Sequence, residues 1–190
     1  MRMPPLKIIG ISGSLRAASL NSAVLRAAKL LLPENVELVI YKQLAELPHF
    51  NPDLEGSEPS SVMNFRKQLQ EADGVLIASP EYAHGVPGTM KNALDWVVAS
   101  GEFVNKPVAL LNVFERSTWA PALLKETLTM MTAIFVESAS ITLPLKSNKA
   151  SESDIASDEE VSKALRTSLA IFVEEIKENK EKYADNCVSR

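Results

Sequence analysis

The sequence has very little cysteine and histidine: one cysteine, Cys187, and two histidines, His49 and His84, in 190 residues. A single cysteine cannot form an internal disulfide. Because no histidine lies near it in the tail, we interpret Cys187 as a bystander thiol rather than a nucleophile. Two histidines without paired spacing do not supply the ligand set of a metal site, so no metal is expected.

Long hydrophobic runs are missing as well. No apolar stretch approaches the roughly 20 residues that a membrane span needs, and the first residues, MRMPPLKIIGIS, lack a signal-peptide core and cleavage site. We therefore expect a cytoplasmic protein without a membrane partner. Basic residues are not in excess either, because the formal net charge is -4. That balance argues against nucleic-acid binding, which needs a basic face to displace counterions.

Short apolar runs alternate with helical patterns along the chain. This alternation predicts one domain over residues 1–190, an open and doubly wound α/β sandwich in three layers around a parallel sheet. Ser157 and Glu160 form a predicted capping box for the last helix, after a polar surface loop at 146–158. The predicted strands are 6–11, 36–41, 74–79, 107–114 and 133–143, and the predicted helices are 21–32, 57–71, 87–99, 118–132 and 158–183.

Ligands of such sheets bind outside the carboxyl ends of the strands, so the loops 12–20, 80–87 and 113–119 are the candidate site. The first loop lacks the G-x-G-x-x-G, the Gly-Lys-Ser/Thr and the complete G-x-S-x-G patterns. It is instead rich in groups that bind a phosphate monoester, at a helix start whose backbone N–H groups are unpaired and with a glycine, Gly13, that permits close backbone approach. These groups come from Ser14, Arg16, Ser19, Leu20, Asn21 and Ser22.

The simpler alternative is that Ser19 or Asn21 is only a helix cap and Arg16 only a solvated charge. In the second loop, prolines and glycines predict a rigid turn with exposed amides that can hydrogen-bond the edge of a flat heteroaromatic ring. Tyr82 either contacts that ring or anchors the loop. His84 is interpreted as a polar loop residue in preference to a proton-transfer group.

Two stretches together, GSLRAASLNSAVLRAA and SPEYAHGVPGTMKNALDW, resemble the NADPH-dependent FMN reductase family, a branch of the flavodoxin-like proteins that includes quinone, azo and chromate reductases. The resemblance covers about residues 6–140. It implies a flavodoxin-like α/β/α sandwich with a five-stranded parallel sheet of order 2-1-3-4-5. It also implies a homodimer or homotetramer. The helix at 87–99, with Trp96 off its core stripe, is a candidate interface; the alternative is that Trp96 is simply buried.

The resemblance implies that FMN is the cofactor, with its phosphate held by Ser14, Arg16, Ser19 and Asn21. Its isoalloxazine and ribityl side would be lined by Pro80, Glu81, Tyr82, Ala83 and His84. The implied activity is ping-pong hydride transfer from NADPH or NADH through FMN to a small-molecule electron acceptor: a quinone, azo dye, nitroaromatic or metal oxyanion. No side chain is expected to act as a catalytic nucleophile, since the flavin carries the chemistry. For a preference for NADPH, Lys91 and Arg116 are the candidate cations.

The third loop departs from the family pattern. Relatives often carry a serine- and glycine-rich stretch after the fourth strand, whereas this chain reads NVFERSTWAP. We expect Phe114 and Trp119 to narrow or cap the flavin face; the alternative for Trp119 is that it anchors its helix in the core. Two other functions stay open: a one-electron carrier similar to flavodoxin, and an FMN-binding regulatory or interaction module without turnover.

Overall fold

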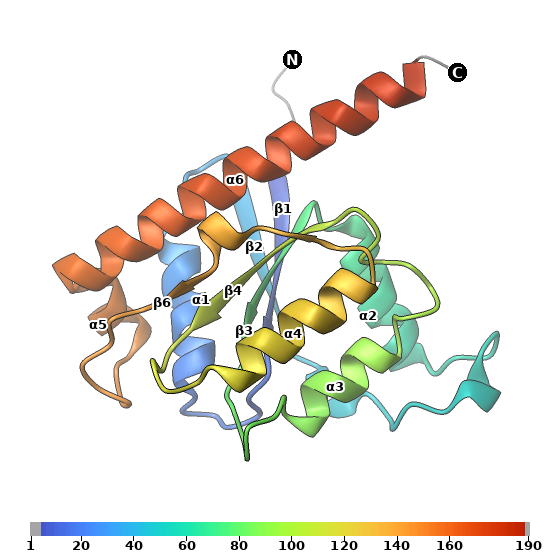
Figure 1. The fold of residues 1–190 in the computed structure, drawn as a ribbon, viewed down its shortest axis with the longest axis horizontal. Coiled ribbons are helices and arrows are strands. Elements are labelled where there is room, and N and C mark those ends of the chain that lie inside the picture. The colour runs from blue at the N-terminus through green and yellow to red at the C-terminus, as the bar shows by residue number, and fades with distance from the viewer. Residues whose placement is uncertain (1–4, 189–190) are drawn as a thin grey trace.

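The structure is a computed structural model that describes residues 5–188, with side chains through residue 183; the Cys187 side chain lies outside the described set. A parallel sheet of order β2-β1-β3-β4-β5, with β6 paired to β4, confirms the predicted topology (Figure 1). The strands are β1 (Leu6–Ser12), β2 (Val36–Tyr41), β3 (Gly74–Ala78), β4 (Pro107–Asn112), β5 (Ile134–Phe135) and β6 (Ile141–Thr142). The helices are α1 (Leu20–Leu31), α2 (Ser60–Glu71), α3 (Gly88–Asp95), α4 (Trp119–Met130), α5 (Glu152–Ser157) and α6 (Glu159–Val188).

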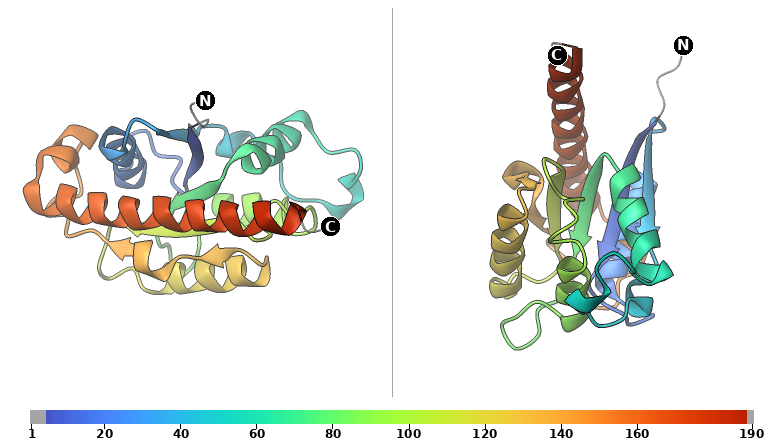
Figure 2. Two further views of the ribbon diagram at one scale, coloured as in Figure 1. Left: turned by 90° about the horizontal axis from the view of Figure 1, so that it is seen from above. Right: turned by 90° about the vertical axis from the view of Figure 1, so that its right-hand side faces the viewer.

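Both faces of the sheet are buried, which explains why the central strands are nearly continuous apolar runs. Neighbouring residues of a strand point to opposite faces, so Ile8 packs with α1, α5 and α6 whereas Ile9 packs with α2, α3 and α4. The helices thus form one layer on each side of the sheet. α6 crosses the molecule in Figure 1, and its C-terminal part extends beyond the sheet in Figure 2.

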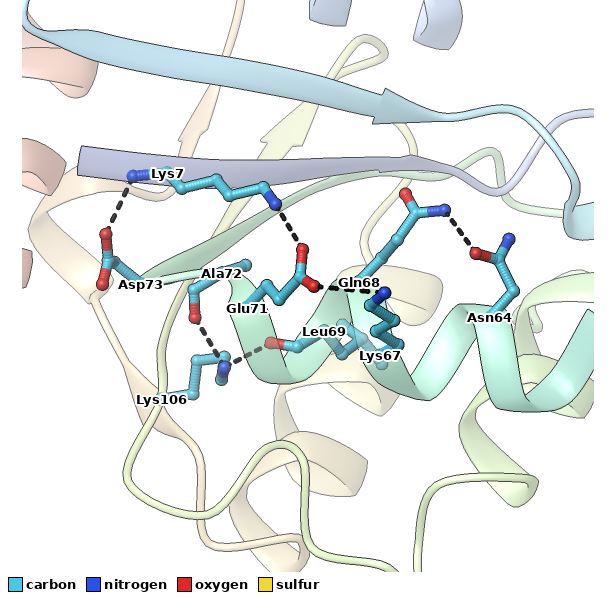
Figure 3. Close-up of polar contacts among 9 residues, drawn as sticks. All are labelled: Lys7, Asn64, Lys67, Gln68, Leu69, Glu71, Ala72, Asp73 and Lys106. Carbon is cyan, nitrogen blue, oxygen red and sulfur yellow. Dashed lines mark hydrogen bonds and ion pairs between the residues drawn. The ribbon is translucent and has the colours of Figure 1, made fainter. Parts of the chain in front are cut away.

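The amino-terminal edge of the sheet is held by polar contacts (Figure 3). Asp73 accepts from the Lys7 backbone N–H at 2.8 Å and from Lys180 Nζ at 2.6 Å, and so links β1 to α6. Lys106 Nζ donates to the Ala72 carbonyl at 2.6 Å and also to that of Leu69, at the C-terminus of α2. These contacts fix the end of the sheet that lies opposite the candidate site.

The predicted fifth strand, 133–143, is broken into two. A 3-10 turn at Glu137–Ala139 separates β5 from β6, and both pair with β4. Within the turn region, Ser140 Oγ accepts from the Leu110 N–H at 3.1 Å and donates to the Val136 carbonyl at 2.9 Å. A side-chain hydroxyl therefore replaces a regular ladder contact at the edge of the sheet.

The predicted capping box was wrong, and of the two alternatives for Trp96 the structure has the buried one. The capping box belongs to the short helix α5, where Ser151 and Asp154 form it, and Asp158 caps α6 by accepting from the N–H groups of Glu160 and Val161. Trp96 is buried, with 1% of its surface exposed, and its Nε1 donates to the Pro48 carbonyl at 2.7 Å. Its ring anchors the loop that follows β2, as the alternative of a buried Trp96 held.

Gly74 provides a test of the packing between the sheet and α6. A Cβ at this position would lie 2.5 Å from Ile176 Cδ1 and 3.0 Å from the Phe172 ring. We expect Gly74→Ala to lower the free energy of unfolding, measured in urea, by about 1–3 kcal/mol, because the added methyl group would overpack the core. Gly88→Ala is the matched control, since no atom of the described chain lies within 4 Å of its Cβ position. Equal stability of the two variants would contradict this packing.

Candidate functional site

The three predicted loops leave one edge of the sheet at nearly the same level. Ser12 at the end of β1 is in register with Ala78 at the end of β3, and Ile77 is in register with Leu110 of β4. The loops that follow β1 and β3 lie at the lower edge in Figure 1. Together the loops line an open cavity of about 460 Å³. Its lining residues are Ser14, Arg16, Ala18, Ser19, Leu20, Asn21, Pro80, Glu81, Tyr82, Phe114, Arg116, Ser117 and Asn148.

The start of α1 presents free hydrogen-bonding groups to this cavity. Ser19 is the N-cap, and its Oγ accepts from the Ser22 N–H at 3.4 Å. Within residues 5–188, the backbone N–H groups of Leu20 and Asn21 have no hydrogen-bond partner. Asn21 is buried, and its Oδ1 is also without a partner in the described chain. The two backbone N–H groups are unpaired donors at a helix N-terminus and favour an anionic ligand, whereas Asn21 Oδ1 is an acceptor and does not contribute to binding an anion.

Arg16 is exposed on the same loop and forms no ion pair within the described residues. A guanidinium without a carboxylate partner is available for a phosphate group. Ser19 therefore does cap the helix, as the simpler alternative held, while Arg16 and Asn21 retain unused binding capacity. This donor set fits the phosphate monoester of FMN.

Ser22 lies differently from its neighbours. Its hydroxyl donates to Ser12 Oγ at 2.9 Å, and Ser22 is not among the lining residues of the cavity. Ser12 Oγ in turn contacts the Ser14 backbone. The Ser22 hydroxyl thus connects α1 to the end of β1 and helps to shape the loop.

Gly13 is required for the packing of the first loop against the second. Its N–H donates to the Ala78 carbonyl at 2.9 Å, and a Cβ would lie 2.2 Å from Ser79 Oγ. The close approach permitted here is between the first and second loops. Any side chain at this position would push the two loops apart.

The second loop forms a tight turn at Tyr82–Gly85, closed by N–H···O bonds of 3.1 and 2.9 Å between these two residues. Ala83 and His84 occupy its central positions with φ of 49° and 58°, as in a type I′ turn. Both residues are exposed and neither is among the lining residues of the cavity, whereas Pro80, Glu81 and Tyr82 are. The turn tip therefore projects beyond the cavity.

Glu81 joins the second loop to α4. Its Oε2 accepts from the backbone N–H groups of Trp119 at 2.8 Å and Ala120 at 2.9 Å, and from Ser117 Oγ at 3.3 Å. The pKa of Glu81 is lowered, chiefly by the bond from the Ala120 N–H and further by those from Trp119 and Ser117. The carboxylate is thus ionised at neutral pH and is used to cap a helix.

The third loop is organised by Asn112, which the sequence did not reveal as important. This buried amide lies within hydrogen-bond distance of the carbonyls of Phe114 (2.8 Å) and Ser117 (3.0 Å) and of Thr142 Oγ1 (3.1 Å).

The side chains of Phe114 and Trp119 are 45% and 56% exposed. The alternative that Trp119 is a core residue was therefore wrong. Its ring stacks on that of His84, with centroids 5.6 Å apart and planes 22° from parallel.

Sequence reasoning missed other lining residues. Arg116 was considered only as a candidate cation, and Asn148 belongs to a stretch predicted as plain surface loop; both line the cavity. No signal in the sequence marks Asn148, because its place in the lining depends on the approach of segments that are distant in the sequence. Among the described residues, no group of three His, Cys, Asp or Glu side chains is placed to hold a metal ion. No helix within residues 5–188 is both long and apolar enough to cross a membrane.

The family model for NADPH-dependent FMN reductases matches residues 6–147, which is most of the chain. The protein therefore belongs to this family, as the two sequence motifs indicated. An NAD(P)H-dependent FMN reductase of Pseudomonas aeruginosa is 39% identical over 109 residues, which are 56% of this chain and 58% of that protein. A quinone reductase of Escherichia coli is 34% identical over 109 residues, 55% of this chain and 58% of its own length. The match thus spans little more than half of these relatives.

The solved structures include FerB, a flavoenzyme NAD(P)H:(acceptor) oxidoreductase of Paracoccus denitrificans. It superimposes with a TM-score of 0.78 at 25% identity, over 92% of this chain and 98% of its own. A flavodoxin from the domain Archaea superimposes with a TM-score of 0.58 at 16% identity, over 90% and 99% of the two chains. These likenesses, together with the strand order, define a flavodoxin-like fold.

The turn at Tyr82–Gly85 provides a local test, because a left-handed conformation costs an ordinary residue roughly 1–2 kcal/mol and asparagine tolerates it better. We expect Ala83→Asn to raise the free energy of unfolding in urea by about 0.5–1 kcal/mol. Ala83→Val is the matched control and should lower it, because a β-branched side chain suits positive φ least. If asparagine and valine had the same effect, the turn would not have this backbone conformation.

Proposed function

We propose that this protein binds FMN at the edge described above and uses NADPH or NADH to reduce small-molecule acceptors, quinones foremost. The observation that carries the proposal is the donor set at the start of α1. It presents to one cavity two backbone N–H groups and an arginine that have no partner among residues 5–188. Membership of the NADPH-dependent FMN reductase family supports the same cofactor and donor.

In this proposal the two sequence motifs contact different parts of FMN. Ser14, Arg16 and the N-terminus of α1 bind the phosphate, and the backbone and ring of the second loop, from Pro80 to Tyr82, lie along the flavin ring. FMN, when bound, supplies the redox chemistry. The described lining of the cavity contains one carboxylate, Glu81, and it is engaged with α4. The protein groups therefore bind FMN, orient it and polarise its ring.

The acceptor would lie against aromatic side chains. Tyr82, Phe114 and Trp119 are all exposed near the carboxyl edge of the sheet, and His84 stacks on Trp119. Flat rings of this kind favour stacking with flat acceptors such as quinones, azo dyes or nitroaromatics. Because donor and acceptor would need the same exposed ring face in turn, a ping-pong order follows.

For the donor, Arg116 is better placed than Lys91 to contact the 2′-phosphate of NADPH. Arg116 lines the cavity and has no ion-pair partner among the described residues, whereas Lys91 is outside the lining and pairs with Asp95. A cation that is already paired with a neighbouring carboxylate has less to offer a phosphate. We therefore propose that this site accepts NADPH through Arg116.

We further propose a homo-oligomer and a cytoplasmic location. Two exposed apolar side chains seven residues apart on α4, Leu123 and Met130, support self-association because such side chains favour burial against a partner. The cytoplasmic location is supported by the proposed donor, since NADPH and NADH are metabolites of the cell interior.

The activity is tested by steady-state oxidation of NADPH by the FMN-loaded protein with and without a quinone. The proposal predicts oxidation that depends on quinone and gives parallel double-reciprocal lines, the pattern of ping-pong kinetics. A protein that binds FMN but shows no quinone-dependent oxidation would instead fit a flavodoxin-like carrier or a module without turnover. Electron transfer that requires a partner protein separates those two.

Arg16 tests the phosphate site. A charge-assisted hydrogen bond contributes roughly 1.5–3 kcal/mol, so we expect Arg16→Ala to weaken FMN binding roughly tenfold to a hundredfold in a fluorescence-quenching titration. Lys163→Ala is the control, because it removes the same charge from an exposed position on α6. Unchanged FMN affinity in Arg16→Ala would return Arg16 to the role of a solvated surface charge.

Trp119 tests the acceptor face. An aromatic contact is worth about 0.5–1.5 kcal/mol, so Trp119→Ala should raise the KM for quinones roughly twofold to tenfold and leave FMN affinity nearly unchanged. Its melting temperature should change little, because the side chain is exposed. Leu123→Ala, one turn further along α4, is the apolar control. An unchanged quinone KM in Trp119→Ala would show that acceptors do not contact this ring.

A further inference from the structure

The N-terminus of α4 lacks a cap of its own. Its N-cap residue, Thr118, makes no side-chain capping bond, and no acidic residue lies in the first turn. The first N–H groups of a helix need acceptors. Glu81, 38 residues before Trp119, supplies the acceptor for these N–H groups. Its Oε2 accepts from the Trp119 N–H at 2.8 Å and from the Ala120 N–H at 2.9 Å.

Trp119 is held twice by the same loop. Its backbone N–H donates to Glu81, and its ring stacks on that of His84, which lies three residues after Glu81. The closed turn at Tyr82–Gly85 fixes the distance between these two anchors. Since the first residue of α4 carries the exposed ring, the position of the helix start decides where that ring lies.

We propose that Glu81 is a positioning residue: by capping α4 it places the Trp119–His84 pair as the wall against which the acceptor packs. This inference rests on the proposed function for the identity of the acceptor. It assigns Glu81 to the acceptor side of the site, whereas the family resemblance implied a cofactor-lining role. In the proposed function the α1 loop and the backbone of the second loop bind FMN, whereas the Glu81 carboxylate is engaged with α4. This side chain therefore contributes to acceptor binding far more than to cofactor binding.

Ionisation of Glu81 is needed for this role. A carboxylate accepts several N–H bonds at once, whereas a protonated acid or an amide accepts them more weakly. The lowered pKa, caused first by the Ala120 N–H, agrees with a group that stays charged at neutral pH. Glu81→Gln should therefore weaken the cap, and Glu81→Ala should remove it.

The first experiment uses the protein without cofactor and measures acrylamide quenching of tryptophan fluorescence. Trp96 is buried, so quenching reports on Trp119, the other of the two tryptophans. We expect the quenching constant to rise in the order wild type, Glu81→Gln, Glu81→Ala, because the ring leaves His84. Glu115→Gln is the matched control: this neighbouring glutamate forms no hydrogen bond or ion pair among the described residues.

The second experiment uses the FMN-loaded protein and compares quinone KM with FMN dissociation constant. We expect Glu81→Gln to raise KM roughly threefold to tenfold, with FMN affinity within about twofold of wild type. Unchanged quenching and unchanged KM in both Glu81 variants would overturn the proposal. So would a loss of FMN affinity as large as the rise in KM, because Glu81 would then be a cofactor ligand.

The two experiments separate this inference from the proposed function. If the wild-type protein bound no FMN, the proposed function would fail, whereas the quenching series would still report whether Glu81 positions Trp119. If Glu81→Ala does not fold, Glu81→Gln retains the shape of the side chain and supplies the same comparison. Quenching that responds only in the control, Glu115→Gln, would contradict the assignment.

Discussion

The close approach of the first two loops is the constraint on which the site depends. β1 and β3 end in register, and Gly13 lies so near Ser79 that a Cβ would be 2.2 Å from its hydroxyl oxygen. This contact places the start of α1 beside the second loop, so the unpaired N–H groups of Leu20 and Asn21 and the residues Pro80–Tyr82 line one cavity. Without it, the two motifs of the family would belong to separate surfaces.

A second connection extends this arrangement to β4. Glu81 caps α4, and Asn112 holds the carbonyls of the intervening loop, so that the third loop has a defined path although it departs from the family pattern. The first loop provides the groups suited to an anion, and the second and third provide aromatic surface. We therefore view the proposed enzyme as a cofactor site formed by the first and second loops, joined to an acceptor face formed by the second and third.

The sequence was sufficient to predict features that depend on local pattern. Continuous apolar runs predicted the buried strands. Arg16 and Asn21 line the cavity, and their role in binding the cofactor stays a prediction. Features that depend on contacts between distant segments were missed, left open or wrong. The capping of α4 by Glu81 has no local signal, Trp96 is buried because the loop after β2 folds over α3, and the strand at 133–143 breaks where Ser140 bonds β4. In each of these cases, hydrogen bonds between segments distant in the sequence determine the local structure.

The central claim is that the edge formed by β1, β3 and β4 holds FMN in a form that a nicotinamide reduces. The most direct measurement is the absorbance spectrum of the purified, FMN-reconstituted protein, recorded without oxygen before and after addition of NADPH. The account predicts a protein-bound flavin spectrum that is bleached by NADPH and restored by a quinone. A protein that retains no FMN after desalting, or a bound flavin that NADPH leaves unchanged, would contradict it.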